Sequence, residues 1–389
     1  MRIVTDEERR ARIGARHALA APVADTLAAT RAMTCLHATE PANVYLSAFA
    51  RSGAGRAETA DALFTRRTVV RQPAMRRTVF AFPRNLLPAV WGSASTRVAA
   101  QLAARLAKEI EAAGVAADGP AWVDRVGERT LAAIRASPST SAQLRAQVPE
   151  LNARIALTGL PGDTPVAPRL LAVLAATGRV VRGENAGGWQ LSRPVWTAVE
   201  QWLPDVPPPV DEAAGYAELV RRWLWSFGPG TEDDLVWWLG ATKGAVRQAL
   251  AAVGAAAVEL ADGSPAWLHP EDTDPVPAGK PWAALLPALD PTAMGWRHRT
   301  FYLAGHRELI FDRNGNAGPT AWWDGRIVGS WTQRPDGTVV VVPIGALPRA
   351  ATAALSRKAA QLSEWLAGEQ VGTIYKAPLV RAAPPEAVG

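Results

Sequence analysis

The chain has 389 residues, 48% of them hydrophobic, and carries a formal net charge of +6 at pH 7. This length allows roughly two to four domains, and one cysteine with five scattered histidines excludes an intramolecular disulfide and disfavours structural zinc. No apolar run reaches transmembrane length and the first ten residues lack a signal-peptide core. We therefore expect a cytoplasmic protein with no metal, no cofactor and no membrane partner.

One order of elements occurs three times, namely short amphipathic helices followed by a β-hairpin. The first copy covers residues 8–92. Residues 68–82 hold two β-prone runs around a Pro-containing turn, which predicts a hairpin. Helical periodicity before this hairpin predicts helices at residues 12–20, 23–32, 42–51 and 56–64.

The second copy covers residues 93–202 and is longer. Ser139-Thr140-Ser141 is a good helix start, and a hairpin is predicted with strands at 179–182 and 189–191. The helices of this copy are predicted at residues 98–113, 120–136, 142–148 and 168–176.

The third copy, residues 203–280, begins with a Pro-rich linker. A helix at 216–227 precedes one that opens at Thr231, a third follows Thr242, and two strands flank the turn 261–264. The acids at 232–234 are what a helix dipole favours in a first turn. This is the order of a winged helix, which commonly places a helix in the DNA major groove. Linked copies would raise each other's effective concentration on one duplex.

From residue 281 the sequence changes to short β-prone runs separated by turns, typical of a small β-barrel or β-sandwich. A helix at 351–367 closes this region, which ends at residue 376, and we expect residues 377–389 to form a disordered tail. The predicted fold class is α+β, mainly α. The β-prone runs are residues 284–289, 309–311, 320–323, 326–331 and 338–343.

Arginines with no acidic residue between them gather on and beside the first hairpin, and they predict contacts to DNA phosphates or the minor groove. A solvated basic surface is the alternative. Arginine supplies most of the positive charge and binds phosphate and base edges bidentately. The third copy adds Lys243 and Arg247 on its last helix. The hairpin arginines are Arg66, Arg67, Arg71, Arg76 and Arg77.

The break before the third predicted helix holds His37 and Thr39, whose spacing in extended backbone places both side chains on one side. Together they could hold a water molecule, with the imidazole as proton acceptor and the hydroxyl as an orienting group. The alternatives are that His37 is a satisfied, partly buried histidine and that Thr39 caps the next helix.

Most of the sixteen tryptophans are interpreted as core residues, since core packing is the commoner use of this side chain. The exception is Trp296, because it is followed by Arg297, His298 and Arg299. A tryptophan set among cations suits a loop that faces DNA. We therefore predict DNA contacts for Trp296, Arg297 and Arg299.

In this order the segments resemble the AlkZ/YcaQ-like winged-helix DNA glycosylases over nearly the whole chain. The resemblance implies three tandem winged helices and a β-barrel arranged as a C-shaped clamp around double-stranded DNA. It also implies a monofunctional glycosylase that excises N7-alkylated, including bulky, purines, and a monomer associated with the nucleoid. The segments that carry it are 36–41, 75–79, 227–231, 237–238, 289–291, 295–297 and 323–331.

The family motif, Gln-x-Gln or Gln-x-Asp, aligns with His37-Ala38-Thr39, and Phe80 stands where a family histidine is expected. The resemblance therefore implies that His37 is the water-activating residue and that Thr39 is a second hydrogen-bond partner. The alternative function is a non-catalytic DNA-binding or regulatory protein that uses the same clamp.

Overall fold

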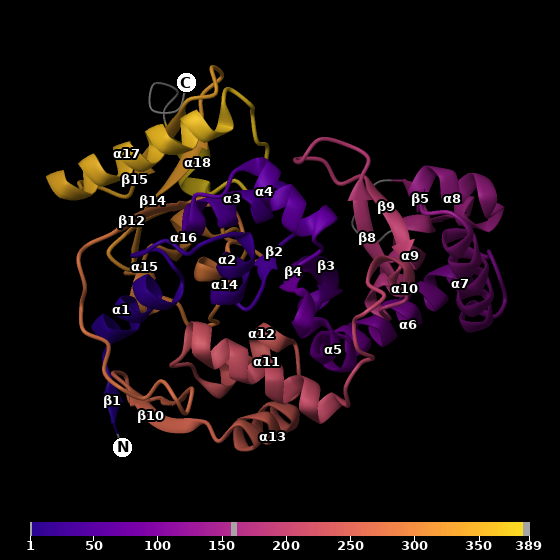
Figure 1. Ribbon diagram of the computed structural model, residues 1–389, viewed down its shortest axis with the longest axis horizontal. Coiled ribbons are helices and arrows are strands. Elements are labelled where there is room, and N and C mark those ends of the chain that lie inside the picture. Colours follow the sequence, from indigo (N-terminus) through magenta and orange to yellow (C-terminus); the bar gives the residue numbers. More distant parts are fainter. Residues whose placement is uncertain (1, 157–161, 384–389) are drawn as a thin grey trace.

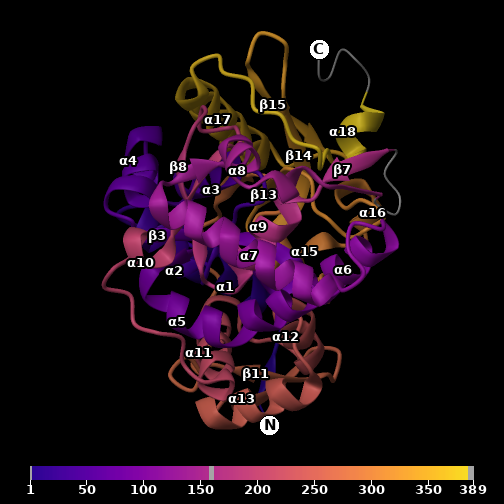
Figure 2. The same cartoon turned by 90° about the vertical axis from the view of Figure 1, so that its right-hand side faces the viewer.

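The structure is a computed structural model that describes residues 2–156 and 162–383, and it shows an α+β fold (Figure 1). We call residues 8–92, 93–202 and 203–280 the first, second and third modules, and residues 281–376 the C-terminal region. In Figure 1 the first module lies centrally, with the third module below it and the C-terminal region above it. The second module projects as a lobe on the right, and Figure 2 looks onto that lobe. Within the described ranges, no helix is long and apolar enough to span a bilayer.

The first module contains the predicted helices followed by a three-stranded antiparallel sheet in the order β2-β4-β3. Helix α2 begins where the Asp25 side chain accepts from the Ala28 amide, and α3 ends at Gly53, whose φ of 72° suits glycine. The elements are α1 (Asp6–Arg16), α2 (Thr26–Ala32), β2 (Leu36–His37), α3 (Ala42–Ser52), α4 (Arg56–Ala60), a π-helical turn (Asp61–Thr65), β3 (Val69–Ala74) and β4 (Thr78–Pro83).

The hairpin of the first module turns later than predicted. Pro73 is not in the turn but lies within β3, where it pairs with Val79. The chain reverses at Met75–Arg77, where the buried Met75 precedes two residues with positive φ, Arg76 at 55° and Arg77 at 62°. Two arginines in the left-handed region mark a turn that its packing holds in place.

The second module repeats the order of the first, helix, strand, helix, helix, strand, strand, with one extra strand pair inserted. Helix α8 starts with a reciprocal capping box between Thr140 and Gln143, as the Ser-Thr-Ser start predicted. Helix α5 (Leu87–Val90) ends the first module, and a π-helical turn (Trp91–Ser95) leads into the second. The elements of the second module are α6 (Thr96–Ala112), α7 (Gly119–Ala136), β5 (Ser139–Thr140), α8 (Ser141–Gln147), β6 (Arg154–Ala156), β7 (Asp163–Pro165), α9 (Ala167–Ala176), β8 (Val180–Asn185), β9 (Pro194–Ala198) and α10 (Val199–Trp202).

The second strand of this module's hairpin is β9, at Pro194–Ala198, so the predicted strand at 189–191 is wrong. Residues 186–193 instead form a loop that leaves the lobe. The ring of Trp189 packs against Tyr45 of α3 at 5.4 Å and Trp365 at 5.6 Å, and its indole N–H donates to Glu369 at 2.7 Å. These contacts outside the module replace strand pairing.

The third module has its predicted helices and hairpin, with α12 opened by a capping box between Thr231 and Asp234. An additional strand, β1 (Ile3–Val4), pairs parallel with β10 and completes a three-stranded sheet. This strand was not predicted, because a strand of two residues carries no periodicity. The remaining elements are α11 (Glu212–Phe227), α12 (Glu232–Leu239), α13 (Lys243–Val253), β10 (Ala256–Leu260) and β11 (Pro265–Leu268).

The C-terminal region contains one antiparallel sheet of four strands in sequential order, covered by α17. Strands β12 and β15 are the two edges of this sheet, and the described residues show no pairing between them. Closure into a barrel therefore stays a prediction. The elements are β12 (Ala283–Leu286), α14 (Pro291–Met294), α15 (Thr300–Leu303), α16 (Arg307–Ile310), β13 (Thr320–Trp323), β14 (Arg326–Gln333), β15 (Val339–Pro343) and α17 (Arg349–Leu366).

Two predictions about this region are wrong in part. Residues 309–311 are not a full strand, since α16 ends at Ile310 and only Phe311 forms an isolated bridge with Ala317. The tail begins with a short helix, α18 (Pro378–Ala382), preceded by a fully buried Ala377. The rest of the predicted disordered tail, residues 384–389, lies outside the described residues.

One hydrophobic core is shared by the first module, the third module and the C-terminal region, while the second module has its own. A buried polar network crosses the shared core. Arg51 and Asp290, both 0% exposed, form an ion pair at 2.7 Å, and Arg51 also donates to the Thr292 hydroxyl. His17 then links Thr292 to the Ser226 carbonyl, with 3.0 Å at each ring nitrogen. Three parts of the chain are thereby joined by fully desolvated groups.

Candidate functional site

His37 lies on β2, the edge strand of the first module's sheet. Leu36 pairs with Ala81 and His37 with Phe80, and the Ala38 amide continues the pairing by donating to the Val79 carbonyl at 2.9 Å. Leu36 points into the shared core, while the ring of His37 meets that of Phe80 edge-on at 5.2 Å. The backbone of the helix break is therefore held by a sheet, which fixes the imidazole.

The His37 side chain is 5% exposed, and its Nδ1 has no hydrogen-bond partner among the described residues. Burial, and then the positive charge of Arg76, lowers the pKa of His37 to about 3. The ring is consequently neutral near pH 7, which revises our expectation of a proton acceptor with an ordinary pKa. A buried polar atom without a partner costs roughly 1–3 kcal/mol. Within the described residues, His37 is therefore not satisfied at Nδ1.

Thr39 has different surroundings, because its side chain is exposed. Helix α3 has Pro41 as its N-cap and no side-chain cap bond, so the interpretation of Thr39 as a helix cap is wrong. A shared water between His37 and Thr39 stays a prediction.

Two guanidinium groups lie against the ring of Trp237 on α12, close to His37. Arg76 comes from the hairpin turn and lies 4.1 Å from the ring centroid, while Arg299 comes from the C-terminal region and lies 4.9 Å from it. Desolvation and the charge of Arg299 lower the pKa of Arg76 to about 10. The Nε of Arg76 is buried without a partner among the described residues. Positive charge is thus concentrated here, and Arg76 forms no ion pair with any carboxylate of the described residues.

Arg71 does not lie on an exposed wing, and this part of the prediction is wrong. Its side chain is 6% exposed and donates to the Gly183 carbonyl of the second module at 3.2 Å. It occupies β3, which packs against α9 and β8. Arg71 therefore attaches the lobe to the first module.

Arg66 and Arg67 lie before the hairpin and already have partners. Arg66 is exposed and pairs with Glu58 and Asp61 from the preceding helical turns. Arg67 donates to the Trp202 carbonyl at 2.9 Å, with its guanidinium 3.9 Å from the Trp202 ring. Arg67 therefore helps to hold the first and second modules together, whereas the ion pairs of Arg66 lie within the first module. DNA contacts of either residue stay a prediction.

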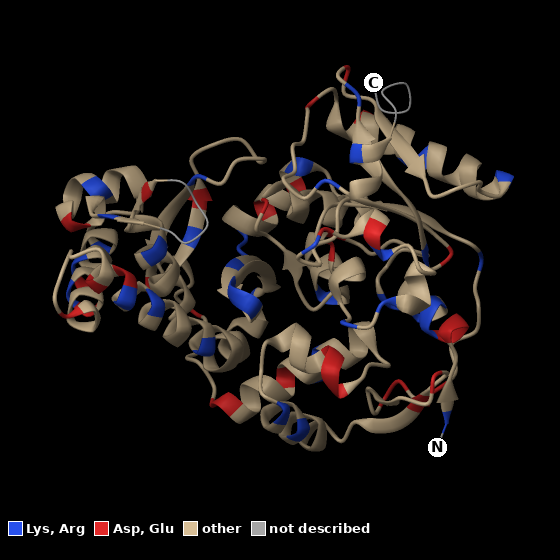
Figure 3. Ribbon diagram, turned by 180° about the vertical axis from the view of Figure 1, so that it is seen from behind, with Lys and Arg blue, Asp and Glu red and all other residues tan. Residues whose placement is uncertain are grey.

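Arg77 and Arg297 are the exposed arginines nearest the Trp237 cluster in sequence. Arg77 follows Arg76 in the turn, and Arg297 reaches to within 3.9 Å of Asp233. Lys243 and Arg247 on α13 are also exposed but face the acids of α12, since Arg247 pairs with Glu232 at 2.6 Å. Figure 3 shows the same mixing elsewhere, with basic and acidic residues interspersed on the second and third modules.

Trp296 is a core residue, so its predicted contact with DNA is wrong. It is 3% exposed, its indole N–H donates to the Phe227 carbonyl at 3.0 Å, and its ring packs edge-on against Phe301 at 5.1 Å. Arg299 is also buried and donates to the Trp296 carbonyl at 2.8 Å. The local sequence could not reveal this, because the surrounding cations suggested an exposed loop.

Asp234 is a structural residue that sequence reasoning treated only as part of an acidic helix start. It is fully buried and accepts from the amides of Arg297 and His298 at 2.8 and 3.0 Å, besides capping α12. It therefore holds the loop of Arg297 and Arg299 against the third module. An acid that only interacts with the helix dipole does not have to be buried. No local signal in the sequence distinguishes Asp234 from Glu232 and Asp233.

No cluster of three or more His, Cys, Asp or Glu side chains that could hold a metal occurs in residues 2–156 and 162–383. Cys35 is buried, and burial raises the pKa of its thiol. The groups near His37 that carry chemistry are therefore a neutral imidazole, guanidinium groups and the Trp237 ring.

Comparison with known proteins gives the family. The family described as DNA glycosylase AlkZ-like matches residues 30–365. The chain belongs to the AlkZ-like DNA glycosylase family. A solved structure of Streptomyces sahachiroi DNA glycosylase AlkZ superimposes with a TM-score of 0.74, covering 95% of this chain and 98% of that one at 19% sequence identity. No curated protein matches the sequence. The AlkZ-like fold thus extends over almost the whole chain.

Proposed function

We propose that this protein is a monofunctional DNA glycosylase that hydrolyses the N-glycosidic bond of N7-alkylated purines in duplex DNA. The observation that carries the proposal is the buried, neutral imidazole of His37, whose Nδ1 is unpartnered, in the segment that aligns with the family motif. A buried polar atom without a hydrogen-bond partner destabilises the folded protein, so we expect this atom to gain a partner when a ligand is bound.

The reaction needs little help from an acid or a base. An N7-alkylated purine carries a positive charge, so when the bond between C1′ and N9 breaks, the bonding electrons neutralise the departing base. A water then adds to C1′ of the oxocarbenium-like sugar and releases its proton to solvent. His37 can accept a hydrogen bond from this water while remaining neutral, and Thr39 can orient it. A histidine with a pKa of about 3 suits positioning better than proton removal.

The basic residues around Trp237 support a DNA-binding face at this position. Arg77 and Arg297 are exposed and suited to phosphates, whereas Arg76 and Arg299 lie against Trp237 and add positive charge behind them. We further propose that the protein acts as a monomer on double-stranded DNA, with its modules and C-terminal region arranged as the clamp expected of the family.

The second candidate is a DNA-binding or regulatory protein without catalysis. Two features favour it: neither glutamine of the family motif is present, and His37 is a poor proton acceptor.

Single-turnover assays on a duplex with one N7-methylguanine, and on one with a bulky N7 adduct, separate the two candidates. Abasic sites are scored for the wild type, His37→Ala and Thr39→Val, with His298→Ala as an exposed-histidine control. We expect release by the wild type and the control, and a loss of at least about 100-fold in His37→Ala. If the wild type binds duplex DNA with a steep salt dependence but releases neither base, the non-catalytic candidate is correct.

A further inference from the structure

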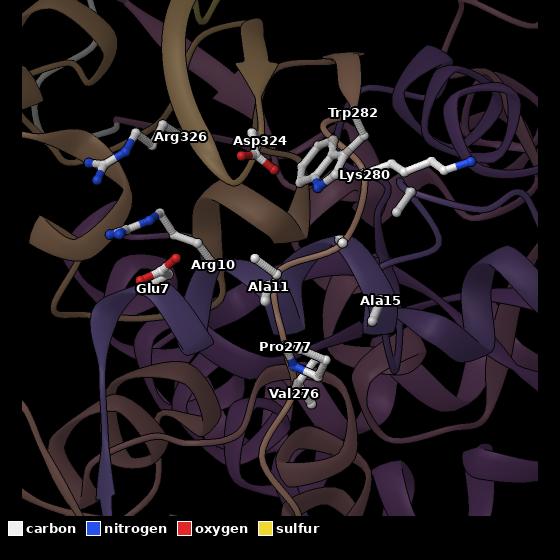
Figure 4. A pocket seen from close by; sticks show the side chains of 14 residues that line it. Glu7, Arg10, Ala11, Ala15, Val276, Pro277, Lys280, Trp282, Asp324 and Arg326 are labelled. Carbon is white, nitrogen blue, oxygen red and sulfur yellow. The ribbon is translucent and has the colours of Figure 1, made fainter.

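A cavity of about 430 Å³ lies outside the candidate site, between α1, the start of β14 and the segment 276–280 that leads into β12 (Figure 4). Small side chains of α1, Ala11 and Ala15, form one wall together with Gly14. The segment 276–280 crosses in front of it, and Trp282 lies at one end. The volume is within the range of small-molecule sites.

Trp282 contributes a polar atom that has no partner. The side chain is 8% exposed, and its indole Nε1 makes no hydrogen bond within the described residues. The N–H edge is turned toward α1, since a Cβ added to Gly14 would come within 2.5 Å of Nε1. Glycine at this position therefore lets the N–H edge of Trp282 approach the backbone of α1 closely, at the wall of the cavity.

Two guanidinium groups meet at the other end of the cavity. Arg10 of α1 and Arg326 of β14 lie side by side in Figure 4. Burial, and then the like charge of Arg326, lowers the pKa of Arg10. Arg10 donates to the Phe301 carbonyl at 2.8 Å, and neither arginine forms an ion pair in the part of the chain described. With Lys280, three cations line the cavity against two carboxylates, Glu7 and Asp324.

We propose that this cavity binds a small organic carboxylate with a compact apolar body. The carboxylate lies between Arg10 and Arg326, a hydrogen-bond acceptor of the ligand faces the Trp282 indole N–H, and the body covers Ala11 and Ala15. A guanidinium pair and a carboxylate match in charge and hydrogen-bond geometry. The small side chains provide an even apolar surface for the body. The proposal does not depend on the proposed glycosylase activity.

Isothermal titration of the full chain with 1-naphthoate, in about 0.15 M salt to screen non-specific attraction, tests this proposal. The neutral analogue 1-naphthalenemethanol separates binding of the charge from binding of the body. We expect saturable binding with a Kd below about 1 mM, at least about 10-fold weaker for the neutral analogue. Arg326→Ala should weaken 1-naphthoate binding about 10-fold and Trp282→Phe about 3-fold. The exposed Arg313→Ala is the matched control and should bind as the wild type does.

Three results would overturn the proposal: no saturable binding of 1-naphthoate at 5 mM, several times the expected Kd limit; equal affinity for the neutral analogue; or the same weakening in Arg313→Ala as in Arg326→Ala. Thermal unfolding is measured for every variant. Should Trp282→Phe be less stable, Arg326→Ala decides the outcome, because Arg326 is exposed and its removal is expected to leave the fold unchanged.

Discussion

His37 and Phe80 face each other directly across strands β2 and β4, with ring centroids 5.2 Å apart. Phe80 occupies the position where the resemblance to the glycosylase family places a histidine. The imidazole thus lies one strand away from the expected position, on the residue that aligns with the first glutamine of the motif. His37 could then serve in place of both the family's glutamine and its histidine.

If His37 works as a neutral hydrogen-bond acceptor, an amide should replace it. We expect His37→Gln to keep base-release activity within about 10-fold of the wild type, whereas His37→Leu, of similar size but without polar atoms, should lose at least about 100-fold. Single-turnover release from an N7-methylguanine duplex measures both. Equal loss in the two variants would mean that His37 acts as a base, and full activity in His37→Leu would remove it from the mechanism.

Burial of His37 also predicts a pH dependence of stability. The folded pKa of about 3 lies below the unfolded value of about 6.5, so between these values the unfolded chain binds the additional proton. Stability is lost as the pH falls through this window, by about 1.4 kcal/mol per pH unit from this group. Urea unfolding at pH 7.5, 5.5 and 4.5 measures the free energy of unfolding of the wild type and of His37→Gln. We expect the difference between the two free energies to shrink or reverse at low pH. His298→Gln controls for removal of an exposed imidazole.

The buried ion pair should be far more sensitive than a surface pair. Asp290→Asn leaves the charge of Arg51 buried without its counter-ion, and we expect a loss of about 3–5 kcal/mol in the free energy of unfolding. Arg135 and Glu200 form a pair at 2.7 Å whose side chains are about half exposed, and Glu200→Gln should cost no more than about 1 kcal/mol. Urea unfolding measures both. Similar losses would show that the Arg51 site is relaxed or hydrated in solution.

Arginines of the first hairpin should separate into two classes. Arg77→Ala should weaken duplex binding irrespective of sequence and reduce the slope of log K against log salt by about 1, because Arg77 is exposed. Arg71→Ala should instead lower the melting temperature, because Arg71 bonds the Gly183 carbonyl. Fluorescence anisotropy at several salt concentrations and thermal unfolding separate these effects. An unchanged slope in Arg77→Ala would move the DNA surface away from this turn.

The loop of Trp189 should tie the second module to the rest of the protein. Trp189→Ala removes the contacts with Tyr45, Trp365 and Glu369, and we expect faster amide exchange in residues 186–193 and around Glu369. Leu191→Ala in the same loop is the control, since Leu191 is 48% exposed. Unaltered exchange in Trp189→Ala would mean that the contacts of β3 and Arg67 position the lobe without this loop.

The sequence predicted the repeated order of elements well, because that order depends on local signals. Helix starts at Thr140, Thr231 and Thr242 were recognised from capping residues whose bonds lie within one turn. Amphipathic periodicity located the long helices in the same way. Capping residues and helical periodicity depend only on residues that are close together in the sequence.

The errors concern residues whose environment is made by distant segments. Trp296 and Arg71 have cationic or β-prone neighbours in sequence, yet their environments come from Phe227 and Gly183. The spacing of His37 and Thr39 in the helix break made His37 a candidate, but the sequence did not predict its burial or the proximity of Arg76, since both depend on β2 joining the hairpin. Local sequence patterns do not show which distant residues bury a side chain.

Strand β1 places residues 3–4 beside residues 259–260, so the sheet of the third module is completed by a strand that is synthesised long before its partner. During translation Ile3 and Val4 must wait for some 250 further residues before they can pair. Until β10 has been synthesised, residues 3–4 remain an unpaired arm in front of α1. The order of synthesis therefore makes closure between α1 and the third module a late event in folding.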